Sequence, residues 1–331
     1  MFNGKTVLIT GGTGSFGHKC VKMLLKRYKL RRLIVFSRDE YKQYLMQQEF
    51  DGPEMRYFLG DVRDLDRLQQ AMRKVDYVIH AAALKQVPAA EYNPMEFIKT
   101  NVNGADNVIK AAIANEVEKV IALSTDKAVN PVNLYGATKL VSDKLFVAAN
   151  NIVGDHRTHF AVVRYGNVIG SRGSVVPYFH KLIAEGAKKL PVTEPQMTRF
   201  WFTLDEGVEF VLKSFARMQG GEIFVPKIPS MRIADLVRSF GADLGMDIIG
   251  IRPGEKLHEL MCPAELAHQT LEFEDHYVIK PAITYFSPVN YEKNPLGEVG
   301  TPVPAGFEYD SGTNLEFLSV AQLSELNRRC Q

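Results

Sequence analysis

Short apolar runs bounded by turn residues recur through the first half of the chain, and longer segments with helical spacing lie between them. The runs are Thr6 to Thr10, Arg32 to Ser37, Arg56 to Gly60, Asp76 to His80, Lys119 to Ser124 and His159 to Arg164. Short runs of this kind predict buried strands, and their alternation with helices predicts successive βαβ units. The expected fold class is therefore α/β, with a Rossmann-type doubly wound parallel sheet and right-handed crossovers.

The pattern changes after the sixth run, where proline and glycine become frequent. Helical spacing persists at Leu204 to Met218 and at Arg232 to Leu244, but irregular segments separate these stretches. We therefore expect a Rossmann domain over residues 1–169. Residues 170–331 are expected to form mainly a smaller C-terminal lobe, with some segments returning to the Rossmann domain. The stretch from Pro288 to Gly312 is rich in Pro, Gly and Asn, which predicts a long loop or tail.

The composition is that of a globular protein with a core: 46% of the 331 residues are hydrophobic. The net charge is only +2, and no basic run is interleaved with aromatic residues, so no nucleic-acid partner is expected. Cys20, Cys262 and Cys330 are an odd number and lie far apart, which favours neither disulfides nor a metal site. We find no signal-peptide layout before Thr6 and no apolar run long enough to span a membrane. The expectation is a cytoplasmic protein without metal or membrane partner.

A glycine-rich loop directly follows the first predicted strand, where residues 10–17 read TGGTGSFG. Glycine lets the chain turn tightly and lets its backbone approach a pyrophosphate, and a helix opening at about His18 would point its N-terminus at the phosphates. This arrangement predicts a dinucleotide site. The loop residues expected to contact the cofactor are Gly11, Thr13, Gly14, Ser15, Phe16 and Gly17.

The tip of the second strand bears on which dinucleotide binds there. An acid at this point normally holds the ribose diol of NAD, but Ser37 and Arg38 come before Asp39. A guanidinium at this point favours the 2′-phosphate of NADP, while Asp39 keeps NAD as the alternative. Further cofactor contacts are expected from residues after the third and fourth strands, namely Asp61, Val62, Ala81, Ala82 and Lys85.

The segment over residues 124–139 reads STDKAVNPVNLYGATK and carries candidate catalytic groups. If Tyr135 begins a helix, Lys139 lies one turn further along the same face, with its ammonium beside the phenol. A free phenol has a pKa near ~10, but a neighbouring ammonium and a cationic nicotinamide would favour the phenolate. The pair is then able to remove a hydroxyl proton while hydride leaves the same carbon.

Seven motifs, in this order, resemble those of the extended short-chain dehydrogenase/reductases that modify nucleotide sugars: TGGTGSFG, FSRDE, GDVRD, AAALKQVP, STDKA, YGATK and RYGNV. Five others resemble, more narrowly, the inverting UDP-N-acetylglucosamine 4,6-dehydratases of the pseudaminic acid pathway: NPVNLYGATKL, GSRGSVVP, MTRFW, IPSM and RPGEKLHE. The resemblance spans most of the chain. It implies that hydride leaves C4 of the sugar for NADP, that water is lost across C5 and C6, and that hydride returns to C6.

The resemblance also implies a role for each candidate. Tyr135 and Lys139 would serve the oxidation, with Ser124 or Thr125 donating a hydrogen bond to the C4 oxygen. Asp126 would protonate the departing C6 hydroxyl, and its neighbour Lys127 would remove the C5 proton. These roles require a raised pKa for the acid and a lowered pKa for the base, as burial would produce. The opposing possibility is a plain ion pair, which would stabilise both charged forms.

The same two positions separate the alternatives. Retaining 4,6-dehydratases usually carry Asp-Glu where this chain has Asp126 and Lys127, and a branch that also epimerises towards fucosamine-type products tends to have Met in place of Tyr135. A 4-epimerase would need Tyr135 and Lys139 but has no elimination to perform. A non-catalytic NADP-binding module would not need any of these side chains.

Substrate contacts are expected mainly from the second half of the chain. Lys85 and Asn167 follow predicted strands, the stretch from Arg172 to Val176 matches a sugar-nucleotide contact of the family, and Arg199 and Arg252 suit the UDP phosphates. The full set of expected substrate residues is Lys85, Asn167, Ser174, Val175, Thr193, Met197, Arg199, Arg252 and Glu255. The resemblance further implies a UDP-sugar partner and a homo-oligomer, with Val141 to Val153 as a candidate surface.

Overall fold

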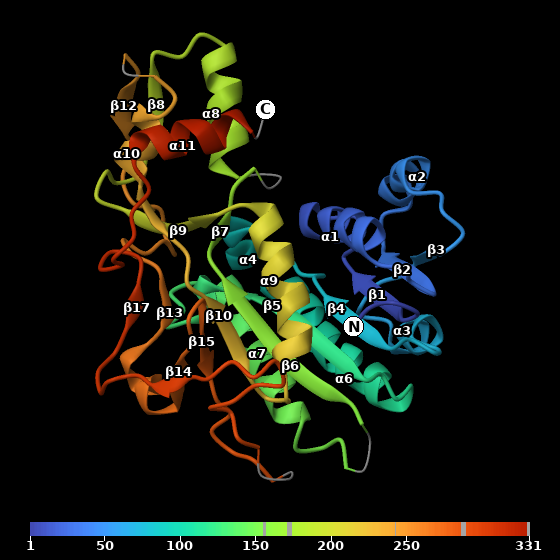
Figure 1. Ribbon diagram of the computed structural model, residues 1–331. Helices are drawn as coiled ribbons and strands as arrows, with labels where there is room; N and C mark the ends of the chain where they lie inside the picture. Colours follow the sequence, from blue (N-terminus) through green and yellow to red (C-terminus); the bar gives the residue numbers. More distant parts are fainter. Residues whose placement is uncertain (155–156, 171–173, 242, 286–288, 330–331) are drawn as a thin grey trace.

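The computed structural model describes residues 1–331 apart from 155–156, 171–173, 242, 286–288 and 330–331. Arg172, Pro288 and Cys330, which the sequence analysis named, lie outside the described residues. Among the described residues, the central sheet has ten strands (Figure 1). They are β1 (Thr6–Thr10), β2 (Arg32–Ser37), β3 (Met55–Leu59), β4 (Tyr77–His80), β5 (Lys119–Thr125), β6 (His159–Tyr165), β10 (Ile223–Pro226), β14 (Thr270–Glu272), β15 (His276–Ile279) and β16 (Thr301–Pro302).

The strand order is β16-β14-β15-β10-β6-β5-β4-β1-β2-β3. All neighbours from β10 to β3 are parallel, and β15, β14 and β16 add an antiparallel edge. The predicted α/β fold with a parallel central sheet is therefore confirmed. The first two predicted strands have the predicted bounds, β3 is shifted by one residue at both ends, and β4, β5 and β6 differ by one residue at one end.

Helices cover both faces of the sheet because successive strand residues point to opposite sides. Val7 and Ile9 face one core, shared with α1 (Ser15–Arg27) and α9 (Leu204–Arg217). Leu8 faces the other core, to which α3 (Leu65–Ala71), α6 (Gly104–Ala114) and α7 (Leu134–Ala149) contribute. The other helices of this part are α2 (Glu40–Glu49), α4 (Val87–Tyr92), α5 (Pro94–Phe97) and the π-helical η1 (Ile98–Asn103). Strands buried on both faces read as continuous apolar runs, which is why the sequence revealed them.

A second, smaller group of elements packs around its own core, which includes Trp201, Phe179 and Leu323. In Figure 1 its helices α8, α10 and α11 lie together, at a distance from α1 and α2 across the molecule. The elements are β7 (Asn167–Val168), α8 (Val175–Ala184), β8 (Lys189–Val192), β9 (Thr198–Phe202), β11 (Ser230–Arg232), α10 (Ile233–Arg238), β12 (Gly245–Ile248) and α11 (Val320–Arg328). The strands pair as β11-β9-β7 and as β12-β8. In Figure 1, β13 (Leu260–Cys262) and β17 (Tyr309–Asp310) lie between this group and the main sheet. The 3-10 turn η3 (Ala264–Gln269) contributes Ala267 to a core of the main sheet.

Three sequence expectations are corrected here. The first helix begins at Ser15 rather than near His18, because the glycine loop leads into it directly. The helix expected to run to Leu244 ends at Arg238, and the chain then enters β12. The stretch expected to be a loop up to Gly312 contains β16 and β17, which pair with β14 and β13. No helix within the described ranges combines the length and apolarity needed to cross a bilayer.

Candidate active site

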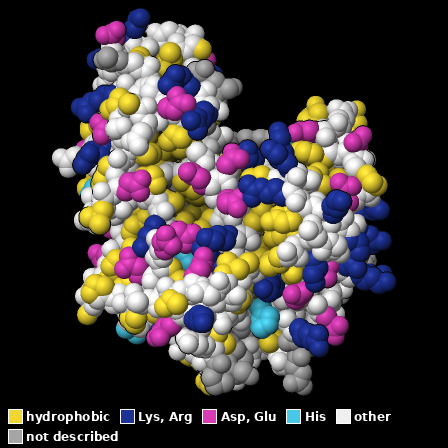
Figure 2. Space-filling model, viewed as in Figure 1, with side chains coloured by type: hydrophobic (Ala, Val, Ile, Leu, Met, Phe, Trp, Pro, Cys, Tyr) yellow, Lys and Arg dark blue, Asp and Glu magenta, His cyan; other side chains and the backbone are white. Residues whose placement is uncertain are grey.

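A cavity of about 520 Å³ lies at the carboxyl ends of the parallel strands. Figure 2 shows the hollow between the part that carries α8 and α11 and the part that carries α1 and α2. This is the edge of a parallel α/β sheet at which ligands usually bind. Its lining includes every residue expected to contact the cofactor, which are Gly11, Thr13, Gly14, Ser15, Phe16, Gly17, Ser37, Arg38, Asp61, Val62, Ala81, Ala82, Lys85, Tyr135 and Lys139.

The glycine loop after β1 is built so that no side chain fits at two of its positions. Gly11 has φ +66°, and a Cβ there would come within 2.8 Å of the Ala82 backbone nitrogen. A Cβ at Gly17 would lie 2.4 Å from Gly12 Cα. The N-cap of α1 is Gly14, which makes no side-chain cap, so the first backbone N–H groups of the helix are available to an anion. This cradle fits the pyrophosphate of a dinucleotide.

The tip of β2 places cations at the edge of the cavity. Asp39 accepts a 2.9 Å hydrogen bond from the Lys42 backbone nitrogen, which caps α2, and its carboxylate also pairs with the Lys42 ammonium. The Arg38 guanidinium is 57% exposed and lies 3.8 Å from the Asp61 carboxylate. Arg38, Asp39 and Lys42 all line the cavity, and the sequence analysis did not name Lys42. The carboxylate of Asp39 is thus engaged by the helix that follows it.

Tyr135 and Lys139 lie on the first turns of α7, as their spacing predicted. Asn133 caps this helix, its side chain accepting a 2.7 Å hydrogen bond from the Gly136 backbone nitrogen. Both Tyr135 and Lys139 are buried and line the cavity. Burial raises the pKa of Tyr135 to about 12 against the opposing charge of Lys127, and burial also lowers the pKa of Lys139. The expected preference for phenolate is therefore absent in the protein alone, because desolvation outweighs the nearby ammonium groups.

The two hydroxyl candidates have different surroundings. Ser124 Oγ donates a 2.8 Å hydrogen bond to Asp143, and Asp143 forms a buried ion pair with Arg164. Thr125 Oγ1 donates a 2.8 Å hydrogen bond to Asp126 and accepts one from the Lys127 backbone nitrogen. Ser124 is thus bonded to a buried ion pair, whereas Thr125 is bonded to the turn formed by Asp126 and Lys127.

Asp126 and Lys127 form the 3-10 turn η2 (Asp126–Ala128) directly after β5. Lys127 Nζ lies 3.1 Å from Asp126 Oδ1, so the structure contains the ion pair that the sequence analysis held open. The Asp126 side chain is fully buried, and its Oδ2 has no hydrogen-bond partner among the described residues. An unpartnered carboxylate oxygen beside a cavity is suited to meeting a substrate hydroxyl.

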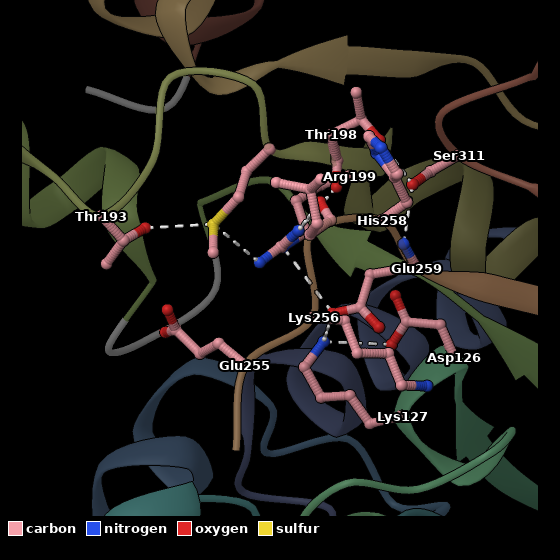
Figure 3. Close-up of polar contacts among 12 residues, drawn as sticks. Asp126, Lys127, Thr193, Thr198, Arg199, Glu255, Lys256, His258, Glu259 and Ser311 are labelled. Atoms are coloured by element: carbon pink, nitrogen blue, oxygen red, sulfur yellow. Dashed lines mark hydrogen bonds and ion pairs between the residues drawn. The ribbon is translucent and has the colours of Figure 1, made fainter. Parts of the chain in front are cut away.

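A third charged residue, which the sequence analysis did not name, contacts this pair. Glu259 precedes β13 and is buried, and its Oε1 lies 3.2 Å from Lys127 Nζ (Figure 3). Burial alone would lower the pKa of Lys127, but the charges of Asp126 and Glu259 raise it above its ordinary value. The expected lowering is therefore wrong for the protein without ligand. Glu259 ends the RPGEKLHE motif, yet nothing in its spacing from Lys127 indicated that the two side chains meet.

The expected substrate residues divide into two sets. Lys85 and Asn167 line the cavity. The others do not line it; they belong to elements of the smaller group or to the segment before β13, and they are Ser174, Val175, Thr193, Met197, Arg199, Arg252 and Glu255. Figure 3 shows Thr193 and Glu255 apart from the Lys127 cluster.

Several of this second set are held by one another or by nearby backbone. Thr193 donates to the Met197 sulfur at 3.1 Å, and Arg252 pairs with Glu255 at 3.1 Å. Arg199 donates to the backbone oxygens of Thr198 and Leu257 and lies 3.7 Å from Glu259. In this state Arg199 therefore belongs to the Glu259 cluster.

A parallel sheet, a glycine cradle after its first strand and a buried Tyr-Lys pair on the helix after its fifth strand together define a Rossmann-type domain of the extended short-chain dehydrogenase/reductase class.

Comparison with known proteins places the chain within this class. Residues 7–281 match the family described as polysaccharide biosynthesis protein, and the chain belongs to that family. It is 60% identical over 327 residues to the UDP-N-acetylglucosamine 4,6-dehydratase (inverting) of Campylobacter jejuni subsp. jejuni serotype O:2, which covers 98% of each chain. It is 46% identical to the UDP-glucose 4-epimerase of Rickettsia akari, over 80% of each chain. The X-ray structure of Pen from Bacillus thuringiensis matches with a TM-score of 0.90 at 37% identity, over 100% of each chain.

Proposed function

We propose that the protein is an NADP-dependent hydro-lyase, a UDP-N-acetylglucosamine 4,6-dehydratase that inverts C5. The product would be UDP-2-acetamido-2,6-dideoxy-β-L-arabino-hex-4-ulose, as the first step of pseudaminic acid biosynthesis for glycosylation of flagellin or other surface components. The observation that carries this proposal is that Tyr135, Lys139 and Lys127 line one cavity, and that Lys127 is paired at 3.1 Å with the buried carboxylate of Asp126. The 60% identity to an inverting dehydratase supports it.

Each pair takes one part of the reaction. When bound, NADP supplies the hydride chemistry by taking a hydride from C4 and returning one to C6. Tyr135 would act as the phenolate, which the Lys139 ammonium and a bound cationic nicotinamide would favour; it takes the proton of the C4 hydroxyl and becomes a neutral phenol. Lys127 takes the C5 proton that the C4 ketone has made acidic. Asp126 gives its proton, from the carboxyl oxygen that has no partner among the described residues, to the C6 hydroxyl, which leaves as water.

The ion pair seen between Asp126 and Lys127 is compatible with these roles. Elimination requires Asp126 as a protonated carboxyl and Lys127 as a neutral amine. The ion pair contains the same number of protons, with the shared proton on Lys127 instead of on Asp126. Transfer of the proton across the 3.1 Å contact converts one form to the other without exchange with solvent. Substrate that excludes water from the site would favour the neutral form, because separated charges lose most on desolvation.

We propose NADP rather than NAD because of the charges at the tip of β2. Asp39, the acid that would otherwise hold a ribose diol, caps α2 and pairs with Lys42. Arg38 and Lys42 then present two cations to a 2′-phosphate. The test is the binding of both dinucleotides to Arg38→Ala: affinity for NADP should fall about tenfold or more, as expected for a lost charge-assisted contact, and affinity for NAD should change little. Arg32→Ala, at the opposite end of β2, is the matched control.

We also propose separate roles for residues 1–169 and residues 170–331. Residues 1–169 would bind NADP and supply the catalytic segment, and residues 170–331 would bind the UDP-sugar, with Arg199 and Arg252 turning to the phosphates on binding. We further propose a homo-oligomer that uses Val141 to Val153, where Val141 is 44% exposed on α7. A monomer at all concentrations in light scattering would contradict that assembly.

The experiment that tests the function is incubation with UDP-N-acetylglucosamine in deuterated water, without added cofactor, followed by proton NMR. A 4-keto-6-deoxy product of L-arabino configuration with deuterium at C5 is expected. If the D-xylo ketone forms first, the enzyme is a retaining dehydratase. If the sugar keeps both its C6 hydroxyl and its C5 proton while C4 inverts, the enzyme is a 4-epimerase, the activity named for the Rickettsia relative. Unreacted sugar after addition of NADP would point to another sugar nucleotide as substrate or to a binding role.

A further inference from the structure

Glu259 contacts the turn that carries Asp126 and Lys127, although it lies far from that turn in the sequence. Its carboxylate lies 3.2 Å from Lys127 Nζ, on an ammonium that also lies 3.1 Å from Asp126. Lys127 thus sits between two buried carboxylates. Glu259 Oε2 has no hydrogen-bond partner among the described residues, so its contacts with cations are what stabilise it in the interior.

The backbone of Glu259 is held firmly in place. Its nitrogen donates a 2.8 Å hydrogen bond to Ser311 Oγ, and its oxygen accepts one of 2.8 Å from the Ser311 nitrogen. Ser311 Oγ in turn lies 2.8 Å from Thr198 Oγ1, which also bonds His258 Nδ1 (Figure 3). A buried carboxylate on so constrained a segment keeps a fixed distance to Lys127, as a positioning group must.

Further cations share the surroundings of Glu259. Arg199 Nε lies 3.7 Å away, and Lys256, whose ammonium donates to the Val129 backbone oxygen, adds positive charge nearby. The ionisable and charged groups that face Lys127 or its carboxylate partners are Asp126, Glu259, Arg199, Lys256 and Tyr135. Of these, only Asp126 and Glu259 lie within ion-pair distance of the Lys127 ammonium.

We propose that Glu259 is a positioning residue for the elimination: it holds the Lys127 ammonium against Asp126 and sets the pH range over which Lys127 acts as a base. This inference rests on the proposed function, since it assigns Lys127 the removal of the C5 proton. Glu259 itself touches neither sugar nor cofactor in this scheme.

The charge of Glu259 determines in which direction its removal shifts the pH dependence of the reaction. A carboxylate beside an ammonium favours its protonated form, so loss of the Glu259 charge lowers the pKa of Lys127. Removal of the C5 proton requires neutral Lys127. Besides the form reached by proton transfer to Asp126, whose fraction does not depend on pH, neutral Lys127 arises when its ammonium loses a proton to solvent. The rate of C5 proton removal therefore rises as pH passes through the pKa of Lys127. In Glu259→Gln the rise should occur at lower pH, by about one to three units, the usual effect of one close opposite charge.

The test is the rate of deuterium incorporation at C5 of UDP-N-acetylglucosamine as a function of pH, with KM and kcat measured alongside. Glu259→Gln should show the shifted profile, a KM within about twofold of wild type and a kcat at the plateau reduced about tenfold or more, because Lys127 loses one of its two anchors. Glu259→Asp keeps the charge at a greater distance and should fall between the two. Glu265→Gln, an exposed residue six positions further on, is the matched control and should leave the profile unchanged.

The outcomes separate this inference from the proposed function. If wild type does not dehydrate the sugar, the proposed function fails and this inference fails with it. If wild type is active and Glu259→Gln loses rate equally at every pH, Glu259 has a merely structural role and the inference is overturned. Should Glu259→Gln not fold, the Glu259→Asp profile decides: a shift to lower pH supports the inference, and an unshifted profile overturns it.

Discussion

The side-chain amide of Asn133 donates a 2.7 Å hydrogen bond to the backbone oxygen of Gly254 and thereby ties the start of α7 to the segment that leads to Glu259. The same side chain caps α7 through Gly136. One residue thus anchors the helix that carries Tyr135 and joins it to the part of the chain that contacts Lys127. Changes at Asn133 should therefore affect both stability and catalysis.

Asn133→Ala should lower the free energy of unfolding by about 1 to 2 kcal/mol, the usual cost of a lost N-cap. Turnover should also fall, about tenfold, because Tyr135 and Lys139 depend on the first turns of α7 for their positions. Thermal unfolding and kcat measure the two effects. Ser319→Ala removes the cap of α11, away from the cavity, and should cost similar stability while leaving kcat unchanged. Equal loss of kcat in both variants would contradict the prediction.

The buried pair between Arg164 and Asp143, with 3.2 Å between nitrogen and oxygen, predicts a large loss of stability when one partner is removed. Asp143→Ala should cost about 3 to 5 kcal/mol, since it leaves a guanidinium charge uncompensated in the core. Denaturant unfolding is the measurement. Glu325→Ala, which breaks the exposed contacts with Arg328 and Arg329, should cost less than about 1 kcal/mol. A similar loss in the free energy of unfolding for the two variants would show that groups other than Asp143 neutralise the Arg164 charge.

Gly17→Ala should abolish dinucleotide binding, because its Cβ would lie 2.4 Å from Gly12 Cα and force the loop away from the helix. Binding can be followed by the fluorescence of the reduced cofactor. Gly186→Ala provides the control. Gly186 has a positive φ of +89° but open space where its Cβ would lie, so a stability loss of about 1 kcal/mol without loss of binding is expected. If Gly17→Ala binds the dinucleotide with wild-type affinity, the glycine loop of residues 10–17 is not the cofactor site.

His80 predicts a specific dependence of stability on pH. Burial, helped by the charge of Lys139, lowers its pKa to about 3, while in the unfolded chain the pKa is near ~6.5. Below pH ~6.5 the unfolded chain binds a proton at His80, whereas the folded protein does not. The stabilisation that neutral His80 contributes to the free energy of unfolding is therefore fully present above pH ~6.5 and is lost as pH falls. Between pH 6.5 and 5 the loss is about 2 kcal/mol.

The comparison is between wild type and His80→Gln across that pH range. The variant should be less stable at every pH because it loses the contact with Thr10, but its free energy of unfolding should fall by about 2 kcal/mol less on acidification. The exposed His268, changed to Gln, should keep the wild-type slope. Parallel curves for wild type and His80→Gln would contradict a buried, neutral His80.

Elements that are continuous in sequence were predictable, and those that depend on distant pairing were not. The strands β1 and β2 are buried on both faces, so each reads as an uninterrupted apolar run with clear ends. By contrast, β16 and β17 have two residues each and exist only because β14 and β13 lie beside them. Such short strands carry no periodicity of their own.

The candidate site shows the same division. The glycine loop and the Tyr135–Lys139 spacing are local patterns, and the residues they indicated line one cavity. The pKa of Lys127 depends on Glu259, which is 132 positions away by residue number and meets it only through the fold. The charges of Asp126 and Glu259 together reversed the expected direction of the pKa shift of Lys127. The ion pair with the neighbouring Asp126 could be considered from the sequence, but the contribution of Glu259 could not.

The pairing of β10 with β6 bears on how such a protein can be divided. Ile223 and Phe224 extend the sheet beyond Val162 and Val163, and β15 and β14 continue it. A fragment cut at residue 170 would expose β6 as an apolar, unpaired edge, the kind of surface through which chains aggregate. Residues 170–331 therefore cannot be exchanged between relatives as an independent unit, because β10, β15 and β14 complete the sheet of the first 169 residues.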